Sequence, residues 1–178
     1  MTNRIHCAYR AGAAAALALA IMLVVAAPAM ADSDLAPNAN NPSMLKNFNF
    51  DHPTFVHKLP DAKENIVIQI SKGGPDQWNM YLHMVQNVLN FFGDGKARIV
   101  VVTYGPGLKM LFANSPVASR IASLDARGVE FDACHNTMVG MSKKLGHLPK
   151  LVPEAVIVPS GLVRITQLEH AGFDYVKL

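Results

Sequence analysis

Cysteine is scarce in this chain of 178 residues, which contains only Cys7 and Cys134. Neither belongs to a paired-cysteine zinc motif, and the histidines form no His-Glu-x-x-His motif, so the sequence predicts no metal site. A P-loop is missing as well, because Lys72-Gly73-Gly74 lacks the spacing and the terminal Lys-Ser/Thr pair of that motif. We therefore expect neither a metal nor a cofactor.

Charge is also scarce, since Lys, Arg, Asp and Glu make up 16% of the chain. Two of the 16 basic residues, Arg4 and Arg10, precede residue 32, whereas none of the 13 acidic residues does. The chain from residue 32 onward therefore has a net charge near +1. Nucleic-acid binding requires a concentrated basic face, so we expect no nucleic-acid partner.

The first 31 residues have the pattern of a secretory signal peptide. A start with two arginines is followed by an apolar run over residues 11–27, and Ala29-Met30-Ala31 is a cleavage motif that predicts a cut before Asp32. An uncleaved membrane anchor is the alternative, but 17 apolar residues are at the short limit for spanning a bilayer. We expect a periplasmic protein without a membrane anchor, in a compartment where thiols are normally paired.

Residues 32–63 are rich in asparagine and proline, a composition that disfavours regular structure. Phe50 and Phe55 give this region some apolar surface. The sequence predicts a partly ordered arm on the domain or on a neighbouring subunit. A flexible spacer is an equal alternative for its first dozen residues.

Residues 64–178 alternate short β-branched runs with amphipathic segments. Strands are expected at 66–70, 98–103, 129–133, 155–158 and 173–177, and helices from Pro75 to Gly93, from Ser115 to Gly128, up to Gly146 and from Ser160 to Gly172. In the last helix, Leu162, Ile165 and Leu168 are expected to face inward. This order predicts one doubly wound α/β domain: a mostly parallel sheet of about five strands with helices on both faces.

Ligands of parallel sheets bind beyond the carboxyl ends of the strands. The turns expected at this edge contain the candidate ligand-binding residues Ser71, Lys72, Gly73, Tyr104, Gly105, Gly107, His135, Asn136, Thr137, Ser160 and Gly161. Cys134 is the candidate catalytic residue, because a thiolate is a nucleophile and the N-terminus of the following helix favours an anion. The N-cap of that helix is expected to be Asn136 or Thr137.

Several segments carry a family resemblance when they are taken in order. They are Gln69-Ile70-Ser71, Trp78-Asn79, Tyr104-Gly105-Pro106-Gly107, Ser115-Pro116-Val117, Ala133-Cys134 with Asn136-Thr137-Met138, Val158-Pro159-Ser160-Gly161 and Gly172-Phe173-Asp174-Tyr175. Together, over residues 65–178, they resemble the DsrE/DsrF-like sulfur-relay family, which includes TusD, and within it a secreted subgroup. The resemblance implies a doubly wound α/β domain that assembles into homo-oligomers and carries sulfur as a persulfide on Cys134. The characterised members act in the cytoplasm, so their sulfur donors and acceptors do not carry over to an exported chain.

Three interpretations of the function remain open at this stage. The first is an exported sulfur carrier or transferase that exchanges a persulfide on Cys134 with a donor or acceptor protein or a small thiol. The second is a non-catalytic module that binds a small anion or thiol compound at the strand ends. The third is an oligomeric scaffold in which Cys134 is an inert core residue, as free cysteine often is.

The predicted cleavage before Asp32 gives a direct test. Protein isolated from its native host should be found in the periplasmic fraction and should begin near Asp32 when its N-terminus is sequenced. An N-terminus at Met1 or Thr2 in a membrane fraction would contradict the signal-peptide prediction.

Overall fold

The computed structural model describes residues 42–178, which have an α/β fold. The predicted signal peptide and the first part of the arm lie outside the described residues. Among residues 42–178, no helix has the length and apolarity needed to cross a bilayer.

The sheet has five parallel strands in the order β4-β3-β2-β1-β5. The strands are β1 (Glu64–Ile70), β2 (Ala97–Thr103), β3 (Glu130–Cys134), β4 (Ala155–Val158) and β5 (Asp174–Lys177). The central strand β2 is buried on both faces, as its unbroken run of β-branched residues predicts. The expected fold class is confirmed.

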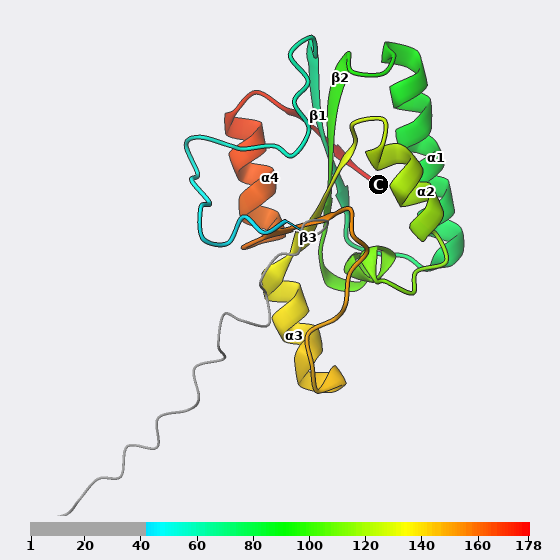
Figure 1. The fold of residues 1–178 in the computed structure, drawn as a ribbon, viewed down its shortest axis with the longest axis vertical. Coiled ribbons are helices and arrows are strands. Elements are labelled where there is room, and N and C mark those ends of the chain that lie inside the picture. The colour runs from blue at the N-terminus through cyan, green and yellow to red at the C-terminus, as the bar shows by residue number, and fades with distance from the viewer. Residues whose placement is uncertain (1–41) are drawn as a thin grey trace, which may run out of the picture. The chain divides into compact units, whose positions relative to one another are not determined.

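Helices cover both faces of this sheet (Figure 1). They are α1 (Pro75–Phe92), α2 (Ala118–Asp125), α3 (His135–Leu145) and α4 (Gly161–His170), and a 3-10 helix, η2, spans Gly105–Leu111. Figure 1 shows α4 on one side of the sheet and α1 with α2 on the other. The larger apolar core lies under α1, α2 and α3, and the smaller one lies under α4.

The direction of the chain changes once, after β4. The chain steps from β1 through β2 and β3 to β4 along the sheet, and α4 then carries it back past β1 to β5. Met138 of α3 packs in the larger core, whereas Ile165 and Leu168 of α4 pack in the smaller one. The connections that follow β3 and β4 therefore leave toward opposite faces, which makes their carboxyl ends the topological switch point where doubly wound proteins bind ligands.

Three local features differ from the expectations. Helix α2 begins at Ala118, because Ser115 and Pro116 form a turn in which the Val117 N–H donates to Ser115 Oγ at 3.4 Å. Residues Gly105–Leu111 form the unforeseen 3-10 helix. In α4, Ile165 and Leu168 are buried as expected, but Leu162 is 60% exposed and Arg164 is fully buried.

The arm covers the β4 edge of the sheet. The Met44 N–H donates to the Ile157 carbonyl at 2.8 Å, and the Ile157 N–H donates to the Pro42 carbonyl at 3.0 Å. Because an uncovered edge presents unpaired backbone groups, these bonds protect β4 from pairing with another chain.

Farther along, the arm is fixed to the domain by a buried charged cluster of Arg164, Glu130 and Asp132. Arg164 Nε donates to Asp132 Oδ2 at 2.8 Å, and its Nη2 donates to Glu130 Oε1 at 2.9 Å and to the Thr54 carbonyl at 2.9 Å. The Val56 N–H of the arm donates to Glu130 Oε2 at 2.7 Å. Both Arg164 and Glu130 therefore anchor the same short segment of the arm, around Thr54 and Val56.

Two carboxyl groups share one guanidinium in this cluster, and burial disfavours their charged forms. Burial and the neighbouring Asp132 raise the pKa of Glu130 to about 8, although Arg164 opposes the shift. Burial also raises the pKa of Asp132, again against the effect of Arg164. Loss of a proton from the two carboxyl groups is therefore disfavoured in the folded chain, because it would leave an excess buried negative charge in the cluster.

The raised pKa of Glu130 predicts how stability depends on pH. The folded chain keeps this proton between the ordinary value of 4.5 and about 8, whereas the unfolded chain releases it. The free energy of unfolding should therefore fall as pH rises through this window, and the contribution should be complete below it. Urea denaturation at a series of pH values should show this slope, and Glu130→Gln should flatten it.

Glu64→Gln is the matched control, because Glu64 is an exposed carboxylate at the start of β1. This variant should keep the slope of the parent chain. Equal slopes for the parent chain and Glu130→Gln would contradict the assignment of the proton to Glu130.

Candidate functional site

Cys134 is both the last residue of β3 and the N-cap of α3. Successive side chains of a strand point to opposite faces, so Cys134 lies on the same face as Glu130 and Asp132, which contact α4 through Arg164. The cysteine is unpaired and 4% exposed. Its side chain therefore lies under the beginning of α4, at the switch point of the sheet.

Helix α4 begins in close contact with this cysteine. A Cβ atom added to Gly161 would lie 3.4 Å from Cys134 Cβ and 3.0 Å from Tyr104 Cδ1. A larger residue at position 161 would push Tyr104 or Cys134 aside, so glycine permits the close approach. Cys134 is thus the N-cap residue of α3, and its Cβ packs beside the first residue of α4, while its side chain makes no capping hydrogen bond.

A polar network lies beside the cysteine on the same face of the sheet. The Gln69 side chain at the end of β1 is 7% exposed, and its amide donates to Tyr104 Oη and to Ser71 Oγ. The Tyr175 hydroxyl of β5 donates to Gln69 Oε1. Partial desolvation, with Tyr104 and Glu169 nearby, raises the pKa of Tyr175 above its ordinary value. The network fixes the Tyr104 ring beside Gly161.

Sequence reasoning included Ser71 and Tyr104 among the candidate residues but missed Gln69 and Tyr175. A buried glutamine within the apolar run of β1 was the available signal, because a buried amide requires hydrogen-bond partners. Tyr175 gave no such signal, because its position beside β1 depends on the crossover from β4 to β5, which pairs β5 with β1.

The loop after β2 is held against both neighbouring strand ends. The Gly105 N–H donates to Thr137 Oγ1 at 3.0 Å, and the Gly107 N–H donates to the Ser71 carbonyl at 3.2 Å. A Cβ atom on Gly107 would lie only 2.8 Å from the carbonyl carbon of Ile70. Gly105, Gly107 and Thr137 therefore position the loop.

The N-cap prediction for α3 was wrong. Cys134 has the extended backbone of an N-cap, with φ −69° and ψ 111°, and α3 begins at His135. The Thr137 hydroxyl bonds to the β2 loop, and Asn136 is exposed while its N–H donates to the Pro159 carbonyl at 3.3 Å. The helix starts earlier because the strand runs directly into it.

The remaining candidate residues lie around the same edge without a common centre. Lys72 is exposed. Gly73 packs over Trp78, because a Cβ atom added to Gly73 would lie 3.1 Å from the indole Nε1 of Trp78. Ser160 is the N-cap of α4 and makes no side-chain capping bond, and His135 is half-buried at the start of α3. The contact with Trp78 links Gly73 to α1, and Cys134, Tyr104 and Gly161 form the centre of the site.

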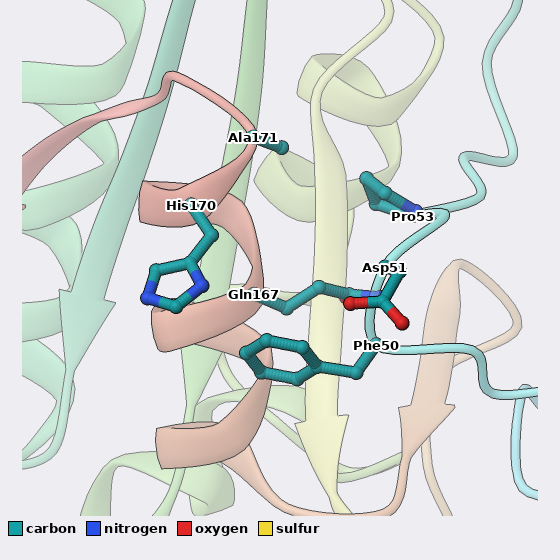
Figure 2. Close-up of a pocket in the computed structure, with 6 residues that line it drawn as sticks. All are labelled: Phe50, Asp51, Pro53, Gln167, His170 and Ala171. Carbon is teal, nitrogen blue, oxygen red and sulfur yellow. The ribbon is translucent and has the colours of Figure 1, made fainter.

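A cavity of about 270 Å³ lies elsewhere, between the arm and the C-terminal half of α4. It is lined by Phe50, Asp51, Pro53, Gln167, His170 and Ala171 (Figure 2). Gln167 is held in place, because its amide donates to the Asn49 carbonyl at 2.6 Å and accepts from Arg164. The cavity lies toward the end of α4 remote from Gly161, so it does not belong to the Cys134 site. Within residues 42–178 no group of side chains has the composition of a metal site.

Comparisons with known proteins support the fold alone. No protein-family model matches the chain, and no curated protein sequence matches it. Among solved structures, it is similar to MTH1491 of Methanobacterium thermoautotrophicum, described as a protein of unknown function. The TM-score is 0.58 at 24% identity, covering 65% of this chain and all of that one. BT1422 of Bacteroides thetaiotaomicron, also of unknown function, gives a TM-score of 0.49 at 15% identity, covering 67% of this chain and 98% of that one.

The close contact at Gly107 predicts a loss of stability on substitution. Gly107→Ala should lower the free energy of unfolding by about 2 kcal/mol or more, because the new methyl group meets the rigid backbone of Ile70. Gly140→Ala is the matched control, since nothing lies within 4 Å of its added Cβ in α3. Alanine in a helix should there raise stability by up to about 1 kcal/mol. A neutral Gly107→Ala in urea denaturation would contradict the tight packing of this loop.

Proposed function

We propose that this protein is an exported sulfur carrier that holds sulfane sulfur as a persulfide on Cys134. The observation that carries the proposal is the position of Cys134 at the switch point, as the N-cap residue of α3 beside the first residue of α4. Both helix ends stabilise a negative charge, and the nucleophile in sulfur transfer is an anion. The resemblance to the DsrE/DsrF-like sulfur-relay family supports the same chemistry at the same residue.

The transfer is a thiol–disulfide type of exchange. The Cys134 thiolate attacks the terminal sulfur of a polysulfide or persulfide donor, an S–S bond to Cys134 forms, and the donor leaves as a thiolate. In the second half, an acceptor thiolate attacks the terminal sulfur of the Cys134 persulfide, and the Cys134 thiolate is regenerated. One sulfur atom moves from donor to acceptor, with no net gain or loss of electrons.

Burial of the thiol bears on how such an exchange takes place. Cys134 is 4% exposed, so Sγ itself offers little surface to a large partner. In a persulfide, the S–S bond of about 2 Å places the reactive terminal sulfur farther from β3 than Sγ of Cys134 is. A small polysulfide or persulfide is therefore the better-suited donor, and a protein acceptor would contact the terminal sulfur.

The same burial favours a second candidate function. Free cysteine packs well as a small apolar side chain, and Cys134 contributes to the buried interior. In this alternative the strand ends form a non-catalytic binding module or scaffold, and the thiol takes no part in the chemistry.

Mass spectrometry on the chain beginning at Asp32, in which Cys134 is the only thiol, decides between the two. After polysulfide treatment the native protein should gain about 32 Da, the mass of one sulfur atom, and a thiol acceptor should remove it. Cys134→Ser should abolish the gain while the fold is retained. Iodoacetamide should alkylate Cys134 in the native protein, because the proposed exchange requires a thiol that a small reagent can reach.

Thr166→Cys in the Cys134→Ser background is the matched control, since position 166 is exposed in the middle of α4. This exposed thiol should be alkylated equally in the native and the denatured protein, which checks the reagent. A Cys134 thiol that alkylates only after denaturation, and never acquires the extra sulfur in the native state, would overturn the carrier proposal in favour of the binding module.

A further inference from the structure

The N-terminus of α1 receives no cap from the described chain. Its N-cap residue is Gly74, which has no side chain to accept a hydrogen bond, and Pro75 at the first helical position has no N–H. The N–H groups of Gly74, Asp76 and Gln77 make no hydrogen bond with residues 42–178, and the ladder begins where the Trp78 N–H donates to the Gly74 carbonyl at 2.9 Å. These unpaired N–H groups carry the partial positive charge of an 18-residue helix.

A buried indole N–H lies at the same helix end. Trp78 is 6% exposed, so more than nine-tenths of this residue is buried, and its Nε1 has no hydrogen-bond partner among residues 42–178. Buried donors of folded proteins are almost always paired. The indole Nε1 faces the loop before α1, because it lies 3.1 Å from the position of a Cβ atom added to Gly73. The unpaired donor therefore indicates that an acceptor from outside the chain binds at this helix end.

The loop before α1 adds a further donor and a positive charge. Lys72 is exposed, and the N–H of Gly73 makes no hydrogen bond with the described part of the chain. Gly73 has a φ of +112°, which residues with a side chain rarely adopt. Successive backbone N–H groups in such a turn form a concave binding surface for anions. The loop thus has the chemistry of an anion site, although it lacks the spacing of a P-loop.

We propose that the loop of residues 72–74 and the first turn of α1 bind a tetrahedral oxyanion of the sulfate or phosphate class. The backbone N–H groups and the Trp78 indole N–H donate to its oxygens, and the Lys72 ammonium group supplies the opposite charge. The Gln77 side chain lies over the indole, since its Oε1 is also 3.1 Å from the Cβ position of Gly73. Gln77 is exposed, so its side chain can turn outward and admit the anion.

One carboxylate opposes the anion. Asp76 is exposed and lies in the first turn of α1, at the same helix end. Its negative charge repels an anion there, and the surrounding water weakens this repulsion without abolishing it. Neutralising Asp76 should therefore strengthen binding, whereas neutralising Lys72 should weaken it. This opposite pair of effects is specific to a negatively charged ligand.

The oxyanion site is separate from the proposed sulfur chemistry. Trp78 packs in the larger core, whereas Cys134 lies on the face of the sheet that α4 covers. Figure 1 shows α1 and α4 on opposite sides of the sheet. Strand β2 also lies between β1, which precedes the loop, and β3, which ends at Cys134. Cys134→Ser should therefore bind the anion as the parent chain does.

The indole signal in a nitrogen-15 NMR spectrum gives a direct test, because Trp78 is the only tryptophan of the chain. The chain beginning at Asp32 should be titrated with sodium sulfate and, separately, with sodium phosphate, with sodium chloride holding the ionic strength constant. The indole proton should shift downfield in a saturable way as it gains an acceptor. Saturation by either ion supports the site, and the ion that binds more tightly identifies the preferred group. An indole signal that neither ion shifts, or that chloride alone shifts equally, would overturn the proposal.

Three variants locate the anion by its charge interactions. Lys72→Gln should weaken binding by about threefold, and Asp76→Asn should strengthen it by about threefold, as expected for single charges at an exposed site. Lys144→Gln is the matched control, because Lys144 is an exposed lysine in the last turn of α3. It should bind as the parent chain does. Unchanged affinity in both Lys72→Gln and Asp76→Asn, or an equal loss in Lys144→Gln, would place the anion elsewhere and overturn the site.

Discussion

The contact of Arg164 with Glu130 and Asp132 is the interaction on which the rest of the structure depends. It joins three separate parts of the chain, since Arg164 belongs to α4, the two carboxyl groups belong to β3, and the Thr54 carbonyl belongs to the arm. Burial of these groups costs desolvation energy, and it is tolerated only because almost every polar atom finds a hydrogen-bond partner. By fixing α4 over β3, the cluster also fixes Gly161 beside Cys134.

The positions of the thiol and of the charged cluster both follow from the two-residue periodicity of strand β3. Glu130, Asp132 and Cys134 occupy alternate positions of β3, so all three face α4. The first two hold the helix, and the third lies where the strand ends and the helix begins. A shift of the β3 register by one residue would move the carboxyl groups into the larger apolar core and would carry the thiol away from α4 at the same time.

The sequence predicted the architecture well because strand and helix periodicities are local. β-Branched runs located β1, β2 and β4, short segments between the expected helices located β3 and β5, and Gly93 and Gly146 marked the ends of α1 and α3. The pattern of α4 correctly predicted that Ile165 and Leu168 face inward, but it did not predict the buried Arg164. A hydrophobic pattern places Leu162 inside and an arginine outside, and only the two carboxyl groups of β3, more than 30 residues earlier, explain why Arg164 is buried. Buried acids in a central strand were the signal that a cation must face them.

The site shows the same division between local and distant causes. Cys134 was identified from its position at a strand end, and Gly161 from its turn, whereas Gln69 and Tyr175 belong to the site only through the pairing of β1 with β5. The surroundings of the thiol also bear on its role. An inert cysteine needs only apolar neighbours, which most positions in this sheet would offer. Position 134 instead lies at the junction of β3 and α3 and beside Gly161 at the start of α4, the residue that also packs against the Tyr104 ring.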